Sequence, residues 1–506
     1  MSCTMRDTRA MSQIKQRETM SNLSTMSRTR RSFGVVGGIG ALAGADVYAK
    51  LIKSTPAASD GEHFDVVFEQ HPDKSGDAGV ASTERKIHVY DTIRAFEKRG
   101  VTTVVLPSFA SHTYLDELRE NSRIEIVDML EGLCAHVRRS FPQARRIGVL
   151  SSELIRESRL FERYFSAPDF EVLHPSPAAD GGPDRVTRAV YDADGIKAGN
   201  VAGWPIELLR GACEDLISRG AEVVLTGLTQ LGPVAGQLGP LRVPLVDSNL
   251  VYAQYVVSGQ YGGPARVFKV GVLGGVGPAA TVDFMQKIVR NTPATRDQDH
   301  IKVLVEQNPQ IPDRTANLIG QGTDPTLSLY ATCKRLEAGD ADIIAIPCNT
   351  AHAFVERIQP HLKVPIVNML SATVDALRTM FPALRRVGLL ATSGTIASGV
   401  YKRALEAADL EQVVPTPELQ ARVMNAIYGP RGVKAGYTSG ECMEDIVAAA
   451  DSLIERGIEV IILGCTELPL LLPQGEWRGT SGVVAWLADP TDILAKRCVA
   501  YARAAG

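Results

Sequence analysis

The stretch GVLGGVGPAATVDFMQKIVRNTPA, residues 271–294, repeats an earlier stretch of the same chain, GVVGGIGALAGADVYAKLIKSTPA, residues 34–57. The two align at an offset of 237 residues, with matching glycines at the start and a matching Thr-Pro-Ala at the end. Self-similarity over so long a period indicates a duplicated structural unit. We therefore predict two related domains in this chain of 506 residues.

The repeat continues through both halves of the chain. VVLPSFASHTY, which contains Pro107, matches IIAIPCNTAHAF, which contains Pro347, and FPQARRIGVL from Phe141 matches FPALRRVGLL from Phe381. Near the end of each half, GLT at residues 227–229 matches GCT at residues 464–466. The predicted organisation is a disordered basic tail (1–31), a first copy (32–257), a Gly-containing linker (258–266) and a second copy (267–506).

Within each copy, short apolar runs alternate with stretches of helical spacing. VGVLGG, IKVLVEQ, RRVGLLAT and EVIILGCT have the composition of strands buried on both faces of a parallel sheet. The stretches 324–342 and 437–459 carry apolar residues at helical spacing and end near glycine. Each copy is therefore predicted to be an α/β domain, with ligands bound beyond the carboxyl ends of its strands.

Composition and charge narrow the classes of function. Basic and acidic residues number 54 and 57, for a net charge of −3, and no apolar run is long enough to cross a membrane. We expect a cytoplasmic protein that acts on small molecules and has no nucleic-acid or membrane partner. The spacing of the eight cysteines suits neither a disulfide scaffold nor a zinc site, so we predict reduced thiols and no metal. Residues 1–31 are rich in Arg and Ser, and we interpret them as a disordered tail. The alternatives are that the start codon is misplaced or that these residues form an organelle transit peptide.

Two cysteines of the second copy follow strand-like runs. Cys348 comes after IIAIP and Cys465 comes after EVIILG. An α/β fold exposes reactive groups at such places, and a helix that begins there would lower the pKa of a thiol. A small buried hydrophobic residue is the alternative role for either cysteine alone.

Five motifs of the second copy occur in the order of a known family: GGVGPAAT, NPQIPDRT, PCNTAH, GLLATSGTI and GCTELPLLL. In these motifs the chain resembles the aspartate racemases of the aspartate/glutamate/hydantoin racemase superfamily, over essentially all of residues 268–506. The resemblance implies two pseudo-symmetric α/β lobes in each catalytic domain, with one cysteine from each lobe. It also implies that the substrate binds between the lobes without pyridoxal phosphate. The spacing of the Gly-rich loop does not favour a nucleotide site, so we expect no cofactor.

Two thiols suit the inversion of an amino-acid α-carbon. One base removes the proton from one face, and a conjugate acid returns a proton to the other. The expected activity is a two-base interconversion of L- and D-aspartate in the second copy, with Cys348 and Cys465 as the acid/base groups. The choice of aspartate rests on NPQIPDRT. The alternatives are a glutamate or broad-specificity amino-acid racemase, or a non-catalytic acidic amino-acid-binding or regulatory protein.

The remaining candidate residues surround the two thiols. Matching to the family motifs implies that Arg314 and Lys434 bind the carboxylates of the substrate, a task that suits the planar fork of arginine. His352 and Asn308 are expected to play supporting roles, and Asp489 a structural one. Side chains that could donate hydrogen bonds to the substrate are Asn349, Thr350, Thr392, Ser393, Thr395 and Thr466.

The first copy lacks the corresponding reactive groups. Ser108 stands where the second copy has Cys348, Leu228 replaces Cys465, and Asp77 aligns with Arg314. A two-base racemisation cannot run there, although Pro107, His112 and Lys197 are retained. Three roles remain open for this copy: a built-in partner in an intramolecular pseudo-dimer, a ligand-binding regulator, or a new reaction of Ser108 with His112. Further homo-oligomerisation also remains open.

Overall fold

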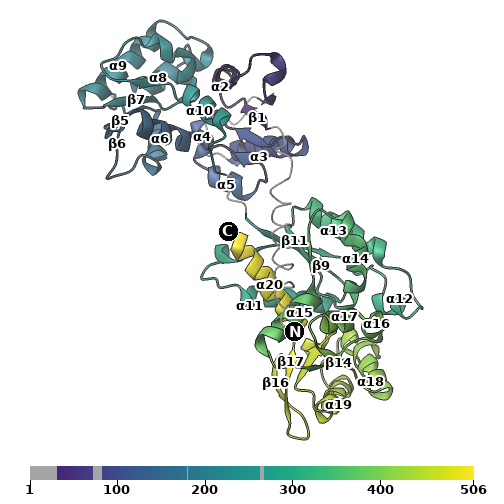
Figure 1. Cartoon of the computed structure of the whole chain (residues 1–506). Helices are drawn as coiled ribbons and strands as arrows, with labels where there is room; N and C mark the ends of the chain where they lie inside the picture. Colours follow the sequence, from purple (N-terminus) through teal and green to yellow (C-terminus); the bar gives the residue numbers. More distant parts are fainter. Residues whose placement is uncertain (1–30, 72–82, 179–180, 263–266, 506) are drawn as a thin grey trace, which may run out of the picture. The chain divides into compact units, whose positions relative to one another are not determined.

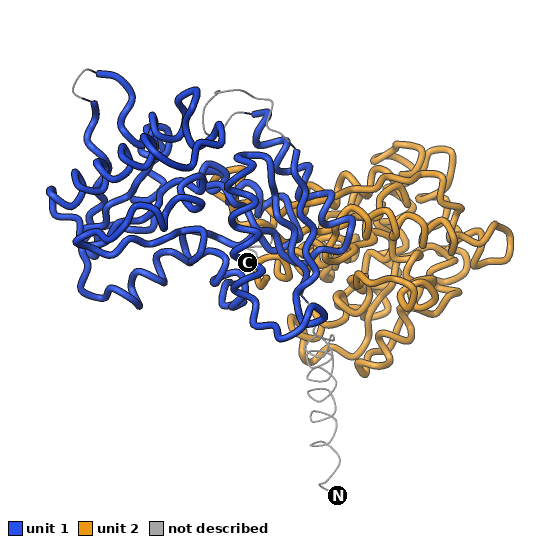
Figure 2. The backbone as a smooth tube through the Cα atoms, turned by 90° about the horizontal axis from the view of Figure 1, so that it is seen from above, with its two compact units in different colours: residues 1–266 blue, residues 267–506 orange. Residues whose placement is uncertain are grey.

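The computed structural model describes residues 31–71, 83–178, 181–262 and 267–505. Figures 1 and 2 show two compact units, residues 1–266 and 267–506. The predicted linker, residues 258–266, ends at this boundary, and its first residue, Ser258, closes a helix. Residues 1–30, Asp77 and residues 263–266, on which several predictions fall, lie outside the described residues.

The first unit contains two four-stranded sheets, ordered β2-β1-β3-β4 and β6-β5-β7-β8. All of their strand pairs are parallel. Helices follow most of the strands. The elements are β1 (Ser32–Gly37), α2 (Ala41–Ser54), β2 (Asp65–Gln70), α3 (Thr83–Lys98), β3 (Thr103–Val105), α4 (Phe109–His112), α5 (Leu115–Glu120), β4 (Glu125–Ile126), α6 (Met129–Ser140), β5 (Arg146–Leu150), α7 (Glu153–Glu157), β6 (Glu171–Leu173), α8 (Arg185–Tyr191), η3 (Ile196–Ala198), α9 (Trp204–Ser218), β7 (Val223–Thr226), η4 (Thr229–Gln237), β8 (Leu245–Val246) and α10 (Ser248–Ser258).

The second unit repeats this plan, with sheets ordered β10-β9-β11-β12 and β14-β13-β15-β17-β16. Its elements are β9 (Lys269–Gly274), α11 (Pro278–Asn291), β10 (Lys302–Gln307), α12 (Arg314–Leu318), α13 (Thr326–Ala338), β11 (Ile343–Ala345), η6 (Thr350–Phe354), α14 (Val355–Ile358), β12 (Ile366–Val367), α15 (Met369–Met380), β13 (Arg386–Leu390), α16 (Ser393–Ser398), α17 (Val400–Glu406), β14 (Glu411–Val413), α18 (Pro417–Tyr428), η8 (Val433–Ala435), α19 (Glu441–Glu455), β15 (Val460–Leu463), η9 (Leu468–Leu470), β16 (Gly475–Arg478), β17 (Val484–Ala488) and α20 (Pro490–Ala505).

These sheets confirm the predicted fold class, a tandem of domains that each contain two parallel-sheet α/β lobes. The helices predicted over 324–342 and 437–459 are α13 and α19. One difference is the edge strand β16, which pairs antiparallel with β17. The two strands are joined by a tight turn that includes Gly482, whose φ of 82° suits glycine. This hairpin extends the second lobe by one strand relative to the first copy.

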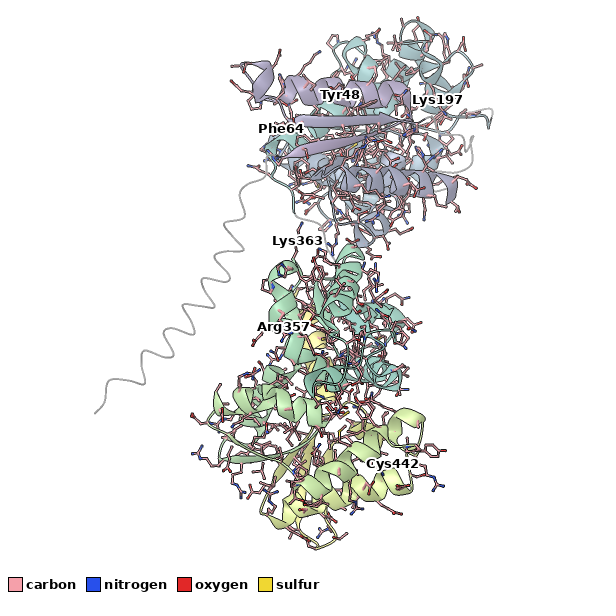
Figure 3. All side chains as sticks on the ribbon, turned by 90° about the vertical axis from the view of Figure 1, so that its right-hand side faces the viewer. Tyr48, Phe64, Lys197, Arg357, Lys363 and Cys442 are labelled. Carbon is pink, nitrogen blue, oxygen red and sulfur yellow. The ribbon has the colours of Figure 1, made fainter. Side chains whose placement is uncertain are left out.

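Both faces of the sheets are covered by helices, which explains the continuous apolar runs in the sequence. In β9, Val270 and Val272 pack with Phe284 of α11 and with α20, whereas Leu273 faces Leu336 of α13. The last helix, α20, therefore returns to the first lobe of its unit. Side chains fill the interior of both units in Figure 3, where Cys442 of α19 is labelled within the second.

The Gly-rich loop after β9 approaches a neighbouring segment closely. Gly277 has a φ of +118°, and a Cβ built on it would lie 2.5 Å from Oε1 of Glu467. Gly40 of the first copy has the same φ, and its Cβ would lie 2.9 Å from Nε2 of Gln230. The loop is thus a tight turn that packs against the segment after β7 in the first copy and after β15 in the second.

Arg31 connects the beginning of the first copy to its end. Its guanidinium donates hydrogen bonds to the carbonyl oxygen atoms of Val257 (3.0 Å) and Val256 (3.4 Å), at the end of α10.

The seven cysteines within the described residues are all free thiols. Among the described helices, none combines the length and apolar character that a membrane crossing needs.

Candidate active site

A small buried cavity in the second unit lies where the strands of its two sheets end. The loops after β9, β10, β11, β13 and β15 supply its walls, together with the end of α18 and with η8. The lining residues are Val276, Arg314, Thr315, Cys348, Asn349, Thr350, Thr392, Tyr428, Lys434, Cys465, Thr466 and Glu467. Most of the predicted site residues are therefore brought together, from segments far apart in the sequence.

The two thiols line this cavity from different lobes. Cys348 follows β11 of one sheet and is 7% exposed, and Cys465 follows β15 of the other sheet and is 6% exposed. Each cysteine precedes a short 3₁₀ turn, η6 or η9, rather than a long α-helix. No α-helix therefore begins directly after either cysteine, so the lowering of a thiol pKa by such a helix does not apply at these two positions.

Cys465 belongs to a buried chain of charged and polar groups. Its thiol donates a hydrogen bond to Oε2 of Glu467 (3.0 Å), and Oε1 of Glu467 forms an ion pair with Lys434 (2.6 Å). Burial, and next the Glu467 carboxylate, raise the pKa of Cys465 well above its usual range. Burial alone would raise the pKa of Glu467, but Lys434 lowers it. Cys465 is thus held as a neutral thiol beside an ionised carboxylate.

Two buried donors in the cavity have no hydrogen-bond partner among the described residues. They are Nε of Arg314 and Nδ2 of Asn349. Nη1 of Arg314 donates to the carbonyl oxygen atoms of Ile311 and Pro312, and Oδ1 of Asn349 accepts from Tyr401. Burial alone would lower the pKa of Arg314, but Cys348 next to it raises that pKa. Unpartnered buried donors are costly and fit a site that takes a carboxylate.

Hydroxyl groups connect the two lobes across the cavity. Thr350 lies 2.7 Å from Thr395, and Thr315 donates to Thr392 over 3.0 Å. Tyr428 of the second lobe donates to Asp313 of the first, over 3.1 Å. The cavity volume is only about 10 Å³, which is room for a single water molecule. An amino acid can therefore enter only if these contacts separate.

His352, Asn308 and Asp489 do not line the cavity. The ring of His352 bridges the carbonyl oxygen of Cys348 (2.9 Å) and the amide of Met369 (3.1 Å), so it fixes the backbone and not the thiol. Asn308 donates to Thr332 of α13. Asp489 forms a buried ion pair with Lys287 (2.5 Å).

Sequence reasoning missed several lining residues: Thr315, Tyr428, Val276 and above all Glu467. An available signal was the acidic residue two positions after Cys465 in GCTELP. Ser393 and Thr395 were expected as donors, but neither is among the lining residues. Thr395 reaches the cavity only through its hydrogen bonds to Thr350 and Thr392.

The first copy has different chemistry at the same places. Ser108 caps α4, Leu228 is buried, and Gln230 occupies the place of Glu467 beside the Gly-rich loop. His112 repeats the contacts of His352, because its ring bridges the carbonyl oxygen of Ser108 and the amide of Met129. The backbone support of the site is therefore kept where the thiols are not.

Both copies match the model of one protein family. The model of the Asp/Glu/Hydantoin racemase family matches residues 36–256 and 273–498. The broad specificity amino-acid racemase RacX of Bacillus subtilis is 28% identical over 40% of this chain and 87% of that protein. A glutamate racemase of Corynebacterium kroppenstedtii is 32% identical over 27% of this chain, and the match spans only 45% of that enzyme. The Picrophilus torridus aspartate racemase structure is 29% identical, with a TM-score of 0.41, over 47% of this chain and 94% of its own. The two matches of the family model together cover most of the sequence. This chain therefore belongs to the Asp/Glu/hydantoin racemase family.

Proposed function

We propose that the second copy is a cofactor-independent amino-acid racemase that interconverts L- and D-aspartate. Cys348 and Cys465 are its proton-transfer groups, acting on opposite faces of the α-carbon. The observation that carries the proposal is one buried cavity lined by both thiols and by the unpartnered donors of Arg314 and Asn349. The thiols supply acid and base, and the donors suit a carboxylate that gains negative charge as the α-proton leaves.

The proton transfers balance without another reactant. In one direction the Cys348 thiolate takes the α-proton, so that the C–H bond breaks and an S–H bond forms. The Cys465 thiol gives its proton to the opposite face of the resulting carbanion. Cys465 is suited to begin as the acid because burial and Glu467 raise its pKa. In the other direction the same transfers run in reverse: the Cys465 thiolate left by the first direction takes the α-proton, and the Cys348 thiol gives its proton to the opposite face.

Closure of the cavity is part of the proposed mechanism. The contacts of Thr315 with Thr392 and of Asp313 with Tyr428 hold the lobes together around a space too small for the substrate. We propose that the lobes open to admit aspartate and then close over it. Closure excludes water, which strengthens the electrostatic stabilisation of the carbanion and keeps solvent from quenching it.

A broader amino-acid specificity is the second candidate. It is favoured by the match to RacX, which extends over 87% of that broad-specificity racemase. One methylene group more or less changes binding by only about 1–3 kcal/mol in an apolar pocket, so aspartate and glutamate are both worth testing.

The test is loss of the α-proton signal of L-aspartate in deuterium oxide, followed by chiral chromatography, without added pyridoxal phosphate. We expect α-proton exchange and formation of D-aspartate by the full chain. Cys348→Ala and Cys465→Ala should each abolish racemisation. Cys333 of α13 is also fully buried but does not line the cavity. Cys333→Ala is therefore the matched control and should retain racemisation. Racemisation that persists in either site variant would contradict the two-thiol proposal, and inversion of glutamate alone would contradict the choice of aspartate.

A further inference from the structure

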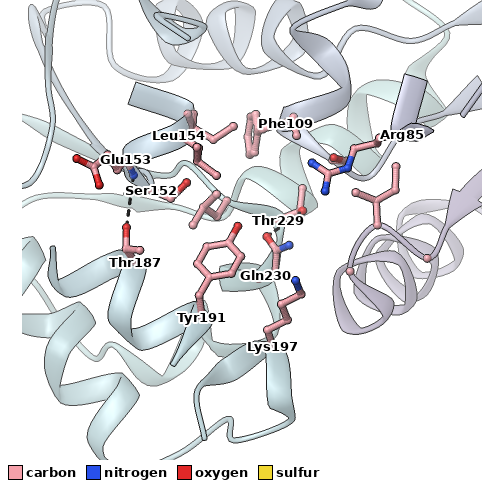
Figure 4. A pocket seen from close by; sticks show the side chains of 17 residues that line it. Arg85, Phe109, Ser152, Glu153, Leu154, Thr187, Tyr191, Lys197, Thr229 and Gln230 are labelled. Carbon is pink, nitrogen blue, oxygen red and sulfur yellow. Dashed lines mark hydrogen bonds between the residues drawn. The ribbon is translucent and has the colours of Figure 1, made fainter. Parts of the chain in front are cut away.

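The first copy keeps an open pocket at the position where the second copy has its small cavity. Described residues line a cavity of about 440 Å³, a size typical of sites for small molecules. Its walls are the loops after β1, β3, β5 and β7, with α3, α8 and η3. Figure 4 shows the side chains of Arg85, Tyr191, Lys197 and Gln230 around this space.

The charge balance of this pocket differs from that of the second copy. In the second copy, Lys434 is paired with the carboxylate of Glu467. In the first copy, the position of Glu467 is held by Gln230, whose side chain is neutral. Lys197, the counterpart of Lys434, forms no ion pair with a carboxylate among the described residues. Its ammonium lies 5.4 Å from the ring centre of Tyr191, as Lys434 lies 5.3 Å from that of Tyr428. The lysine is therefore kept in place while its counter-charge is lost.

A second cation and a buried hydroxyl also face the pocket. Arg85 of α3 lines it, at a position that aligns with Pro325 in the second copy. The carboxylate of Glu153 turns away to solvent, where it is 57% exposed beside Arg156. Ser152 is 1% exposed, and its hydroxyl has no hydrogen-bond partner among the described residues. The pocket thus offers positive charge and an unused donor to an anion.

The rest of the lining is more apolar than in the second copy. Leu228 replaces Cys465, Phe109 replaces Asn349, and Ile155 replaces Thr395. These substitutions remove a thiol, an amide and a hydroxyl, and they add aliphatic and aromatic surface. They favour a ligand with an apolar body and leave no proton-transfer pair at the two thiol positions.

We propose that the first copy binds, without reaction, a small monocarboxylate with an apolar side chain and no ammonium group, such as a branched-chain 2-oxo acid. Lys197 attracts the carboxylate, Ser152 and Gln230 donate to its oxygen atoms, and Leu228, Ile155 and Phe109 enclose the apolar part. A zwitterionic amino acid fits less well, because Glu153, the one carboxylate among the described lining residues, turns away to solvent and does not face Lys197. This site is independent of the proposed racemase activity.

Calorimetric titration of the full chain with 4-methyl-2-oxopentanoate tests the proposal, with L-leucine as the ligand control of the same carbon skeleton. We expect saturable binding of one oxo acid per chain and markedly weaker binding of leucine. Lys197→Met keeps the aliphatic stem but removes the charge, and Gln230→Glu restores a carboxylate beside the lysine. Each should weaken binding about tenfold or more, since each removes or neutralises a charge-assisted contact.

Two control variants separate this site from the rest of the chain. Arg188→Met removes an exposed arginine of α8 that is paired with Asp192, and it should leave binding unchanged. Lys434→Met alters the second copy and should also leave the affinity for the oxo acid unchanged. Lack of saturable binding at millimolar concentration would overturn the proposal. Equal binding of leucine, or a loss of binding in Lys434→Met and not in Lys197→Met, would overturn it as well.

Discussion

The thiol of Cys465 donates a 3.0 Å hydrogen bond to Glu467, a buried carboxylate that Lys434 keeps ionised. A thiol whose pKa is raised by burial and by a neighbouring anion stays protonated, so it holds a proton ready to be donated. The carboxylate orients this acid, because its hydrogen bond holds Sγ and the thiol proton in place. In the proposed mechanism Glu467 is a positioning residue for Cys465.

Glu467→Gln should therefore slow racemisation about 10²- to 10⁴-fold, the usual contribution of a positioned acid or base. The same change should lower the pKa of Cys465, because the carboxylate that raises it is removed. Steady-state racemisation and the pH dependence of Cys465 alkylation measure the two effects. Glu406→Gln, at an exposed side chain 3.9 Å from Lys402, is the control and should change neither. Full activity in Glu467→Gln would refute the role of this carboxylate.

Arg314→Lys should lower kcat/KM for racemisation even though the positive charge is kept. Lysine cannot replace the unpartnered Nε donor, nor can it form a planar fork against a carboxylate. We expect kcat/KM for racemisation to fall about 10- to 100-fold, the equivalent of one or two charge-assisted hydrogen bonds. Arg357→Lys is the matched control, because that side chain, labelled in Figure 3, is 62% exposed. An unchanged kcat/KM in Arg314→Lys would remove Arg314 from the binding site.

Gly277→Ala should destabilise the second unit and reduce its activity together. Alanine is strained at a φ of +118°, and its Cβ would lie 2.5 Å from Oε1 of Glu467, so the carboxylate must move. We expect a loss of about 1–3 kcal/mol in the free energy of unfolding, measured by chemical denaturation. Gly236→Ala, where the added Cβ meets nothing within 4 Å, should be nearly neutral. Equal stability of the two variants would contradict this account of the loop.

Stability should fall on mild acidification. Burial, the largest effect on this ring, lowers the pKa of His352 below 6.5, so between its two pKa values the unfolded chain binds a proton that the folded protein does not. The free energy of unfolding should therefore decrease as the pH drops below about 6.5, by up to about 1.4 kcal/mol per pH unit for this residue.

Denaturation midpoints between pH 7 and pH 5 measure this slope. His352→Gln should lower stability at pH 7 because it disturbs the bonds to Cys348 and Met369, but it should also flatten the pH dependence. His361→Gln, at an exposed ring, should leave the slope as it is. A slope that stays the same in His352→Gln would show that another group is responsible.

The fold was predictable from the sequence to a large extent, because its signals are local or repeated. Continuous apolar runs gave β9, β10, β13 and β15, and helical spacing gave α13 and α19. The antiparallel strand β16 was not predicted, because it has no counterpart in the first copy and its residues, GEWR, form no apolar run.

The site was predictable only where a motif carries its own chemistry. Cys348 and Cys465 could be singled out because two cysteines follow strand-like runs in equivalent contexts and each stands in a motif of the family, PCNTAH or GCTELPLLL. Tyr428 and Thr315 could not, because their importance arises from bonds to Asp313 and Thr392, which only the folded chain brings near. Glu467 was overlooked because an acidic residue in a loop is usually a solvated charge, whereas here it is 3% exposed and paired with Lys434.

The hydrogen bonds of Arg31 to the last turn of α10 bear on how such a chain could arise. They fasten the point where the polypeptide enters the first copy to the point where it leaves, so this copy is a closed loop of chain with adjoining ends. A module of that kind can be joined head to tail with a duplicate without rethreading either one. Each duplicate can then accumulate substitutions separately, so that one sheds its thiols while the other retains them.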